Sequence, residues 1–274
     1  MRDPIPFLRL RRIGLASLAV AMVAGGLGGC KSVDFGDVTG SISTKAPPTD
    51  PAMLRSYTDE LGKRYDAKPN DPNVAMAYAR ALRAQGQFAQ AVAVLQTAAA
   101  KNAENRAVIG AFGKALADAG RFKEASEVLP RAHTPERPDW SVLSTQGSVA
   151  DQLGDHAAAQ GYYASALKIA PGEPSVLSNL GLSYALSKDL ARAEDTLRQA
   201  IEHPRADMRV RQNLALVLAL RGKFDEAETV SRRDLSPTDA SANVMTIRKM
   251  IVESNTWRQI QEGGKAKPAA SRRG

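Results

Sequence analysis

Small and apolar residues recur along this chain with a period of 34 residues. One position of the period holds Gly86, Gly120, Gly154, Lys188 and Gly222. Five residues later the chain has Ala91, Ala125, Ala159, Ala193 and Ala227. Seven residues before it stand Ala79, Gly113, Gly147, Gly181 and Ala215, and two residues after it Phe88, Phe122, His156, Leu190 and Phe224. No insertion interrupts the pattern over residues 72–241, so it marks an internal repeat.

The spacing predicts two antiparallel helices in each repeat. The small residue of the first helix and the alanine of the second allow the two backbones to approach closely. The glycine supplies a positive φ where the first helix ends. One unit cannot bury its own apolar face, so the units are expected to stack into a single solenoid.

The unit resembles the tetratricopeptide repeat (TPR), which has a Leu-Gly, Tyr, Gly-x-Phe-x-x-Ala, Ala, Pro pattern. The likeness is plainest in SNLGLSYALSKDLARAEDTLRQAI, from Ser178 to Ile201. The resemblance implies an all-α fold, a right-handed α-solenoid of TPR repeats over residues 51–262. Its five units are 72–105, 106–139, 140–173, 174–207 and 208–241.

Both ends of the repeat array are expected to be atypical. Residues 51–69 match the second helix of a missing unit, with Leu54, Tyr57 and Leu61 at core places. After the array, Ser236 to Asp239 reads as a capping box that starts a closing helix over about 237–261. That helix carries Val244, Ile247 and Ile251 on one stripe. Residues 263–274 read as a disordered basic tail in solvent, with contact to anionic lipid as the alternative.

The first thirty residues have the pattern of a processing segment. Four arginines precede an apolar run that begins at Ile13 and ends among glycines. The run has about 15 residues, fewer than the roughly 20 that a transmembrane helix needs. Residues 1–29 are therefore interpreted as a signal peptide, and a retained membrane span is the weaker alternative.

Residues Leu27 to Cys30 resemble the lipobox of bacterial lipoproteins, with small residues between the leucine and the only cysteine of the chain. The resemblance implies a covalent lipid on Cys30 after cleavage of residues 1–29, and residues 30–50 as the lipidated cysteine and a flexible tether. Lys31, rather than an aspartate, implies a place in the outer membrane, facing the periplasm. The alternative is a signal peptide cleaved elsewhere, with an incidental thiol at Cys30.

Composition removes several other classes of function. A single cysteine excludes a disulfide scaffold. The net charge of +8 resides mostly in residues 1–29 (+3) and 258–274 (+4), so the body has only +1 and no footprint for nucleic acid. No catalytic motif or metal-ligand spacing occurs, and His156 occupies a packing position filled by Phe in three sister units. We therefore expect no enzyme activity, no small-molecule substrate, no metal and no cofactor beyond the lipid on Cys30. Carboxylates such as Asp59 and Glu226 are expected on exposed helix surface.

Protein binding is the remaining function. In TPR proteins the groove is lined mainly by the second, fifth, sixth, ninth, twelfth and thirteenth places of the first helix of each unit. Carried over, these places give Asn73, Met76, Arg80, Arg83, Gly110, Lys114, Ser141, Ser144, Ser148, Asp151, Ser178, Asn179, Leu182, Leu186, Arg209, Gln212, Asn213, Leu216 and Leu220. The groove is expected to run from basic through polar to apolar.

The resemblance suggests a partner segment along this groove. Its acidic residues would face Arg80, Arg83 and Lys114, and Asn179 and Asn213 would bind its backbone. Its apolar face would lie against Leu182, Leu186, Leu216 and Leu220. Alternatively, the closing helix covers these leucines.

Signal, lipobox, tether and repeats together resemble the TadD lipoproteins of the tight-adherence (Flp) pilus assembly system. That resemblance implies a lipid-anchored scaffold whose partners are a secretin or pilus-assembly subunits. The alternative is an outer-membrane adaptor that recruits peptidoglycan hydrolases or synthases.

Overall fold

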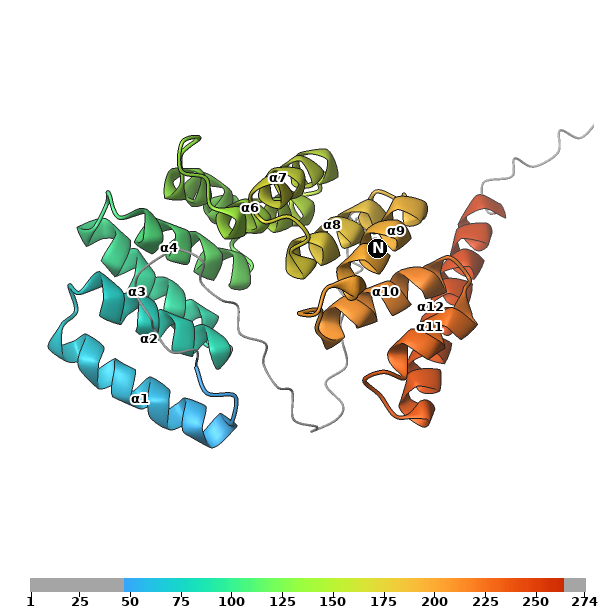
Figure 1. Ribbon diagram of the computed structural model, residues 1–274, viewed down its shortest axis with the longest axis horizontal. Helices are drawn as coiled ribbons and strands as arrows, with labels where there is room; N and C mark the ends of the chain where they lie inside the picture. The colour runs from blue at the N-terminus through green and yellow to red at the C-terminus, as the bar shows by residue number, and fades with distance from the viewer. Residues whose placement is uncertain (1–46, 264–274) are drawn as a thin grey trace, which may run out of the picture. The chain divides into compact units, whose positions relative to one another are not determined.

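A computed structural model describes residues 47–263, with side chains described as far as Glu253 (Figure 1). These residues belong to one compact unit. In chain order the helices are α1 (Pro51–Ala67), α2 (Pro72–Ala84), α3 (Phe88–Lys101), α4 (Arg106–Asp118), α5 (Phe122–Val128), the 3₁₀ helix η1 (Leu129–Ala132), α6 (Trp140–Gln152), α7 (His156–Ile169), α8 (Pro174–Leu186), α9 (Leu190–Glu202), α10 (Met208–Leu220), α11 (Phe224–Ser231) and α12 (Pro237–Gly263). The predicted all-α repeat architecture is confirmed.

The helix boundaries repeat with the period of the sequence. The first helix of each unit, here called the A helix, begins at Pro72, Arg106, Trp140, Pro174 and Met208. The second, the B helix, begins at Phe88, Phe122, His156, Leu190 and Phe224. One residue before each A helix, a side-chain oxygen accepts a backbone N–H of the first turn: Asp71, Asn105, Asp139, Glu173 and Asp207. These caps fix where each unit starts because they satisfy backbone donors that the helix itself cannot pair.

The turn between the A and B helices has the backbone conformation that the sequence predicted. Gly86, Gly120, Gly154 and Gly222 all have φ between 72° and 87°. Lys188 takes the same conformation, with φ of 67°, although it has a side chain. The fourth unit therefore keeps the turn geometry with a residue that is less suited to it.

Close contact between the A and B helices explains the small residues of the repeat. A Cβ atom added to Gly113 would lie 2.5 Å from Cδ2 of Leu129. At Gly147 the added atom would lie 2.6 Å from Cε1 of Tyr163, which is closer than real Cβ contacts allow. The five alanines of the B helices are fully buried: Ala91, Ala125, Ala159, Ala193 and Ala227.

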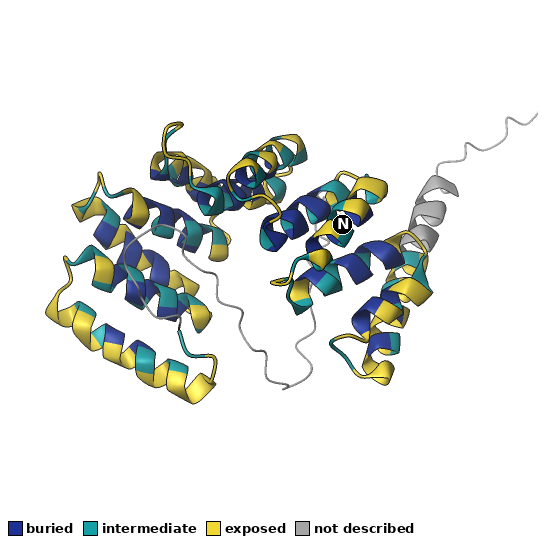
Figure 2. Ribbon diagram, in the orientation of Figure 1, coloured by how far each residue is buried: buried dark blue, intermediate teal, exposed yellow. Residues whose placement is uncertain are grey.

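The units stack so that their A helices form a continuous layer. Neighbouring A helices contact one another along the series α2, α4, α6, α8 and α10. Among the described helices, neighbouring B helices make no such contacts, so they lie farther apart on the other side of the array. Figure 2 shows the buried residues where the helices face one another.

The second unit departs from the regular repeat at its B helix. Helix α5 ends at Val128 and continues as η1, which contains Pro130. Proline lacks the N–H that an α-helix needs, and its ring clashes with the preceding turn. The chain then makes a loop closed by hydrogen bonds between Thr134 and Arg137 before Asp139 caps α6.

Helices α1 and α12 continue the register of the repeat beyond the five units. Shifted by one period, the B helix α3 (Phe88–Lys101) falls on residues 54–67 of α1. Valine recurs at the third place of every A helix and once more in α12: Val74, Val108, Val142, Val176, Val210 and Val244. Val244 is buried and packs with α10 and α11, as the A helix of a sixth unit would. Half of the predicted capping box is present: the backbone N–H of Asp239 donates to Oγ of Ser236, whose hydroxyl donates to Oδ2 of Asp239.

Candidate functional site

The layer of A helices exposes one continuous row of side chains that the packing does not bury. We call this row, together with its neighbours at the fifth, sixth, twelfth and thirteenth places, the inner face. Its ninth places hold Arg80, Lys114, Ser148, Leu182 and Leu216, none of which is buried. Its chemistry changes along the array from cationic to polar to apolar, as the sequence predicted.

The cationic end of the inner face has less net positive charge than its sequence suggests. Arg83 forms an ion pair with Asp118, with 2.5 Å between Nε and Oδ2, so its charge is largely neutralised. Lys114 donates from Nζ to the hydroxyl of Ser141 in the next unit at 2.9 Å, a contact with a neutral group. Two of the three predicted cations therefore also join neighbouring units.

In the middle of the inner face, side chains predicted to line a groove instead connect successive units. Asn213 donates from Nδ2 to Oγ of Ser178 at 2.9 Å, and Asn179 makes the equivalent contact to Ser144 at 3.4 Å. Ser144 and Ser178 are buried, which corrects their assignment to the groove surface. Each serine side chain is too short to extend beyond the asparagine of the next unit that donates to it. Asn179, Gln212 and Asn213 remain partly exposed, and Ser148 is exposed.

The side chain of Asp151 is also buried and does not line the expected groove. Its side chain is only 7% exposed and accepts hydrogen bonds from the hydroxyls of Ser183 at 2.8 Å and Tyr163 at 3.1 Å. Nδ1 of His156 lies 2.8 Å from Oδ1 of Asp151, so this nitrogen carries the proton. Burial, and then the charge of Asp151, raise the pKa of Tyr163. This group, the Asp151 cluster, gives His156 a structural role and joins units three and four.

The apolar end of the inner face is open. Leu186 is 52% exposed and Leu220 is 40% exposed, while Leu182 and Leu216 are partly exposed. Helix α12 contacts α10 and α11 but not α8, so its described part does not cover Leu182 and Leu186. The alternative, in which the closing helix hides the leucines, therefore fails for this pair; on α10, Leu220 stays 40% exposed.

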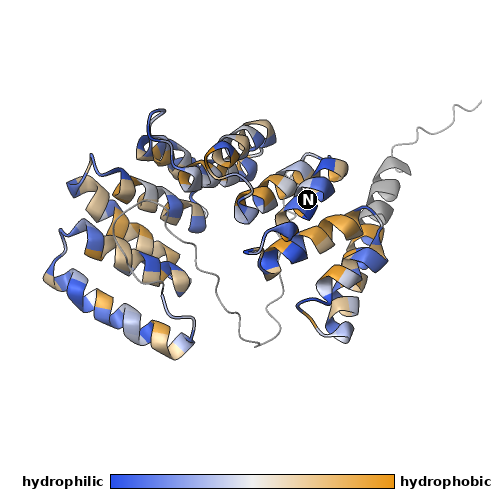
Figure 3. Cartoon of the chain, in the orientation of Figure 1, coloured by the Kyte–Doolittle hydropathy of each residue, from blue (hydrophilic) through white to orange (hydrophobic). Residues whose placement is uncertain are grey.

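The sequence reasoning missed Met250 at this end. Met250 follows Leu216 by one period, stands on α12 and is 56% exposed. Extending the repeat register by one more unit would have found it. Figure 3 shows α10 as hydrophobic along most of its length, whereas α1 is largely hydrophilic.

Family comparison agrees with this architecture. Models of the tetratricopeptide repeat match residues 82–141, 144–208 and 208–233, together more than half of the chain. The chain belongs to the tetratricopeptide repeat family. TPR repeats generally serve as non-catalytic scaffolds that bind other proteins. No curated protein sequence matches the chain at a significant level.

Solved structures share the TPR fold at low sequence identity. PilW, described as a widely conserved type IV pilus biogenesis factor, is 14% identical with a TM-score of 0.61, over 71% of this chain and 91% of PilW. PilF of Pseudomonas aeruginosa is 20% identical with a TM-score of 0.51, over 77% of this chain and 92% of PilF. A chain of the APC/C hetero-tetramer Cut9-Hcn1 is 19% identical with a TM-score of 0.57, over 70% of this chain but only 40% of that chain. These likenesses establish the fold alone.

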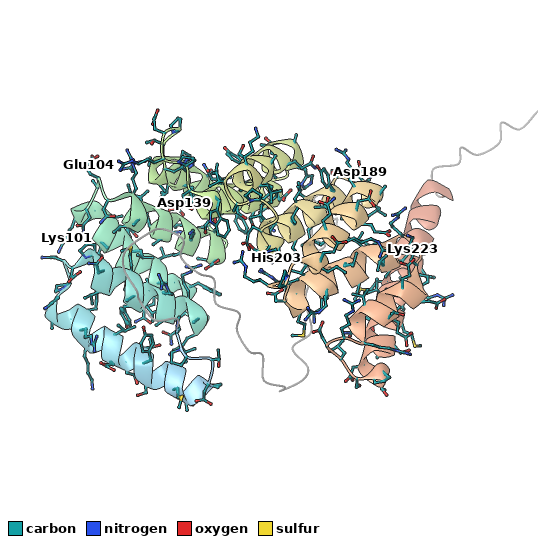
Figure 4. All side chains as sticks on the ribbon, in the orientation of Figure 1. Lys101, Glu104, Asp139, Asp189, His203 and Lys223 are labelled. Atoms are coloured by element: carbon teal, nitrogen blue, oxygen red, sulfur yellow. The ribbon has the colours of Figure 1, made fainter. Side chains whose placement is uncertain are left out.

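A second buried carboxylate holds the last two TPR units together. The side chain of Glu194 is 5% exposed and accepts hydrogen bonds from Nζ of Lys223 at 2.9 Å and Nε of Arg198 at 2.8 Å. Arg221 is a third partner. Burial alone would raise the pKa of Glu194, but these hydrogen bonds and charges outweigh it and lower the pKa. Lys223, labelled in Figure 4, directly precedes α11, so the Glu194 cluster connects α9 to the α10–α11 turn.

The described residues also contain an apolar cavity and several exposed carboxylates. A cavity of about 260 Å³ among α3, α4 and α5 is lined by alanines, Ile109, Phe112 and Val128, with Arg131 and Gln96 as its only polar side chains. Within the described part of the chain, no three His, Cys, Asp or Glu residues could hold a metal ion. None of the helices over residues 47–263 has the length and apolar character to cross a membrane. Asp59, Glu60, Asp225 and Glu226 are exposed, as expected.

Several predictions concern residues outside the described part of the TPR protein. Cys30, the signal peptide over 1–29 and most of the tether precede residue 47, and the basic tail follows residue 263. The lipid on Cys30 and the outer-membrane location stay predictions.

Proposed function

We propose that this TPR protein is a lipid-anchored scaffold that holds subunits of a tight-adherence (Flp type IV) pilus and its secretin during assembly. The observation that carries the proposal is the open apolar end of the inner face, where Leu186 and Leu220 are exposed on a folded, repeat-built surface. Exposed leucines in a row cost solubility and are typical of a protein-binding site. The fold likeness to PilW and PilF is consistent with a pilus role.

The chemistry of the inner face specifies the partner segment. An amphipathic helix or extended segment would place apolar side chains against Leu182, Leu186, Leu216 and Leu220. Acidic residues of that segment would face the cationic end of the inner face, where Arg83 already pairs with Asp118. Affinity therefore resides mainly at the apolar end, and the cationic end sets the direction of the bound segment.

The anchor is proposed from the sequence around Cys30. Several acyl chains on one cysteine would make membrane attachment stable. Replacing Cys30 by Ser tests it directly: metabolic labelling with an alkyne-tagged palmitate should label the native protein and not the variant. If the variant stayed labelled, or if it stayed in the outer-membrane fraction, the anchor would be wrong.

Affinity purification from detergent-solubilised outer membranes, followed by mass spectrometry, tests the binding function. The native chain should recover a secretin and pilus-assembly subunits. The double variant Leu186→Asp with Leu220→Asp should lose them, because two charges at the centre of an apolar contact remove its driving force. Leu153→Asp is the matched control, since Leu153 is also exposed (45%) but lies at the α6–α7 turn.

The other outcomes are equally informative. Recovery of peptidoglycan hydrolases or synthases, without pilus subunits, would replace the proposal with the adaptor function. Retention of every partner by the double variant, with its fold intact by circular dichroism, would remove the inner face as the binding site.

A further inference from the structure

The described array begins and ends with half of a repeat unit. Helix α1 has the register of a B helix, and residues 47–50 directly before it are not helical. Helix α12 has the register of an A helix, with Val244 and Ile247 packed on the fifth unit. The described residues contain no B helix after α12. Each end therefore exposes the face that in a complete unit packs against the other helix.

The open face of α12 is formed by the fourth, eighth and eleventh places of the A-helix register, counted from Ala242. Met245 is 67% exposed, Val252 is 57% exposed, and Lys249 lies between them. The same places in the second unit are Ile109, Gly113 and Leu116, all of them buried within the array. A capping helix with a purely polar outer face would leave no such apolar surface.

The open face of α1 is formed by Met53, Tyr57, Glu60 and Arg64. These residues are spaced by four, three and four along the helix, so they share one side of it. Met53 is 66% exposed, and Tyr57 is only partly covered by α2. One period later, Tyr57 and Arg64 correspond to Ala91 and Ala98, which are buried within the array. Among the described residues, neither end of the array therefore has a complementary helix.

We infer that a second copy of this chain supplies it: α1 of one molecule packs antiparallel on α12 of the next, at a wider helix separation than inside a unit, because Lys249 and Tyr57 stand where complete units have small residues. The repeat register places Tyr57 opposite Val252 and Glu60 beside Lys249, an apolar pair and an ion pair of opposite charge. In their own chain Glu60 pairs with Arg64, and Lys249 lies 3.8 Å from Glu253, both across exposed single turns. Such exposed pairs are weak, so they exchange readily for the intermolecular one.

The charge pattern selects this arrangement over a symmetric one. Two α12 helices packed face to face would bring Lys249 against its own copy, and like charges in contact are unfavourable. The contact between α1 and α12 is heterologous, so it leaves one free end of each kind and generates short chains or a ring. Lys249 and Arg64 are larger than the small residues of a complete unit, so the contact is looser and reversible.

Complementation between two blocked variants tests the inference on the full chain in detergent. The tail-blocked variant carries Met245→Asp and Val252→Asp, and the head-blocked variant carries Glu60→Lys. All three positions are exposed, so circular dichroism should show an unchanged fold for both variants. Sedimentation velocity over about a hundredfold range of concentration measures the mass, because self-association depends on concentration.

The native chain should increase in mass with concentration beyond a dimer. Each blocked variant alone should stay monomeric. Their equimolar mixture should form dimers and nothing larger, because one intact α12 meets one intact α1. Combining Glu60→Lys with Lys249→Glu in one chain should restore the native behaviour.

Three results would overturn the inference. A native chain that stays monomeric throughout would exclude self-association through these ends. A head-blocked variant that still dimerises would assign the contact to two α12 helices. An equimolar mixture that stays monomeric would show that α1 and α12 do not complete each other. None of these results bears on partner binding at the inner face, so the two proposals fail separately.

Discussion

Units one and two of this solenoid are joined almost entirely by apolar side chains, whereas units three to five add buried polar groups to their apolar contacts. One continuous apolar cluster extends from α2 to α6. The buried polar residues of the units all come later in the chain: Ser144, Gln146, Glu173, Ser178, Ser183, Glu194 and Ser231. A buried polar group must keep its hydrogen bonds, so these later joints permit fewer relative positions of the helices. The comparison teaches that one repeat pattern can build joints of two kinds.

The largest expected difference between the two halves lies at Asp151. Replacing Asp151 by Ala leaves the hydroxyls of Tyr163 and Ser183 and the ring N–H of His156 without their acceptor. The free energy of unfolding should fall by about 3 kcal/mol. Asp118→Ala is the matched control in the earlier half, where the pair with Arg83 is partly exposed and should be worth about 1 kcal/mol or less. Urea denaturation of both variants measures the contrast, and equal losses would refute it.

Overpacking the close contact of the helices should affect both halves alike. Ala125 and Ala159 are fully buried at equivalent places of α5 and α7. Replacing either by Leu should lower the free energy of unfolding by about 1 to 3 kcal/mol. Ala93→Leu, on the exposed side of α3, is the control. An unchanged melting temperature for Ala125→Leu or Ala159→Leu would count against the shared helix register.

A smaller effect should appear as a pH dependence at the Glu194 cluster of the later half. The pKa of Glu194 is lowered below its ordinary value of 4.5, so its contribution to stability is present above that pH. It is lost as the pH falls through the lower folded value. The difference in unfolding free energy between the native chain and Glu194→Gln should therefore be largest near neutral pH and shrink in acid. Urea titrations at several pH values measure it; a difference that stayed constant would exclude the Glu194 cluster as its source.

The smallest expected effect concerns the fourth turn. Replacing Lys188 by Gly relieves a side chain held at φ of 67° and should raise stability by about 0.5 to 1 kcal/mol. Gly154→Ala introduces the same strain in the third turn and should lower stability by a similar amount. Thermal unfolding of the two variants should show melting temperatures shifted in opposite directions.

The sequence predicted the helices and turns because the same residue types recur at the same places in five repeats. The identity of Lys188 as a turn residue, for example, followed from its spacing to Gly154 and Gly222. The Asp151 cluster could not be predicted, because Tyr163 and Ser183 reach Asp151 from different helices and leave no local pattern in the sequence. The burial of Ser144 and Ser178 was missed because family positions give a direction on the helix and not the reach of a side chain. Met250 was predictable from the period.

The two kinds of joint also govern how the number of repeats can change. Loss of residues 72–105 would bring α1 against α4, where Ala111 and Ala115 stand at the places of Ala77 and Ala81. Helix α1 would then pack on α4 against alanines at the same places as in α2. Loss of residues 174–207 would instead bring Val217 to the place of Ser183, against the carboxylate of Asp151. Insertion or deletion of whole repeats is therefore tolerated at the amino end of the solenoid and resisted beyond its third unit.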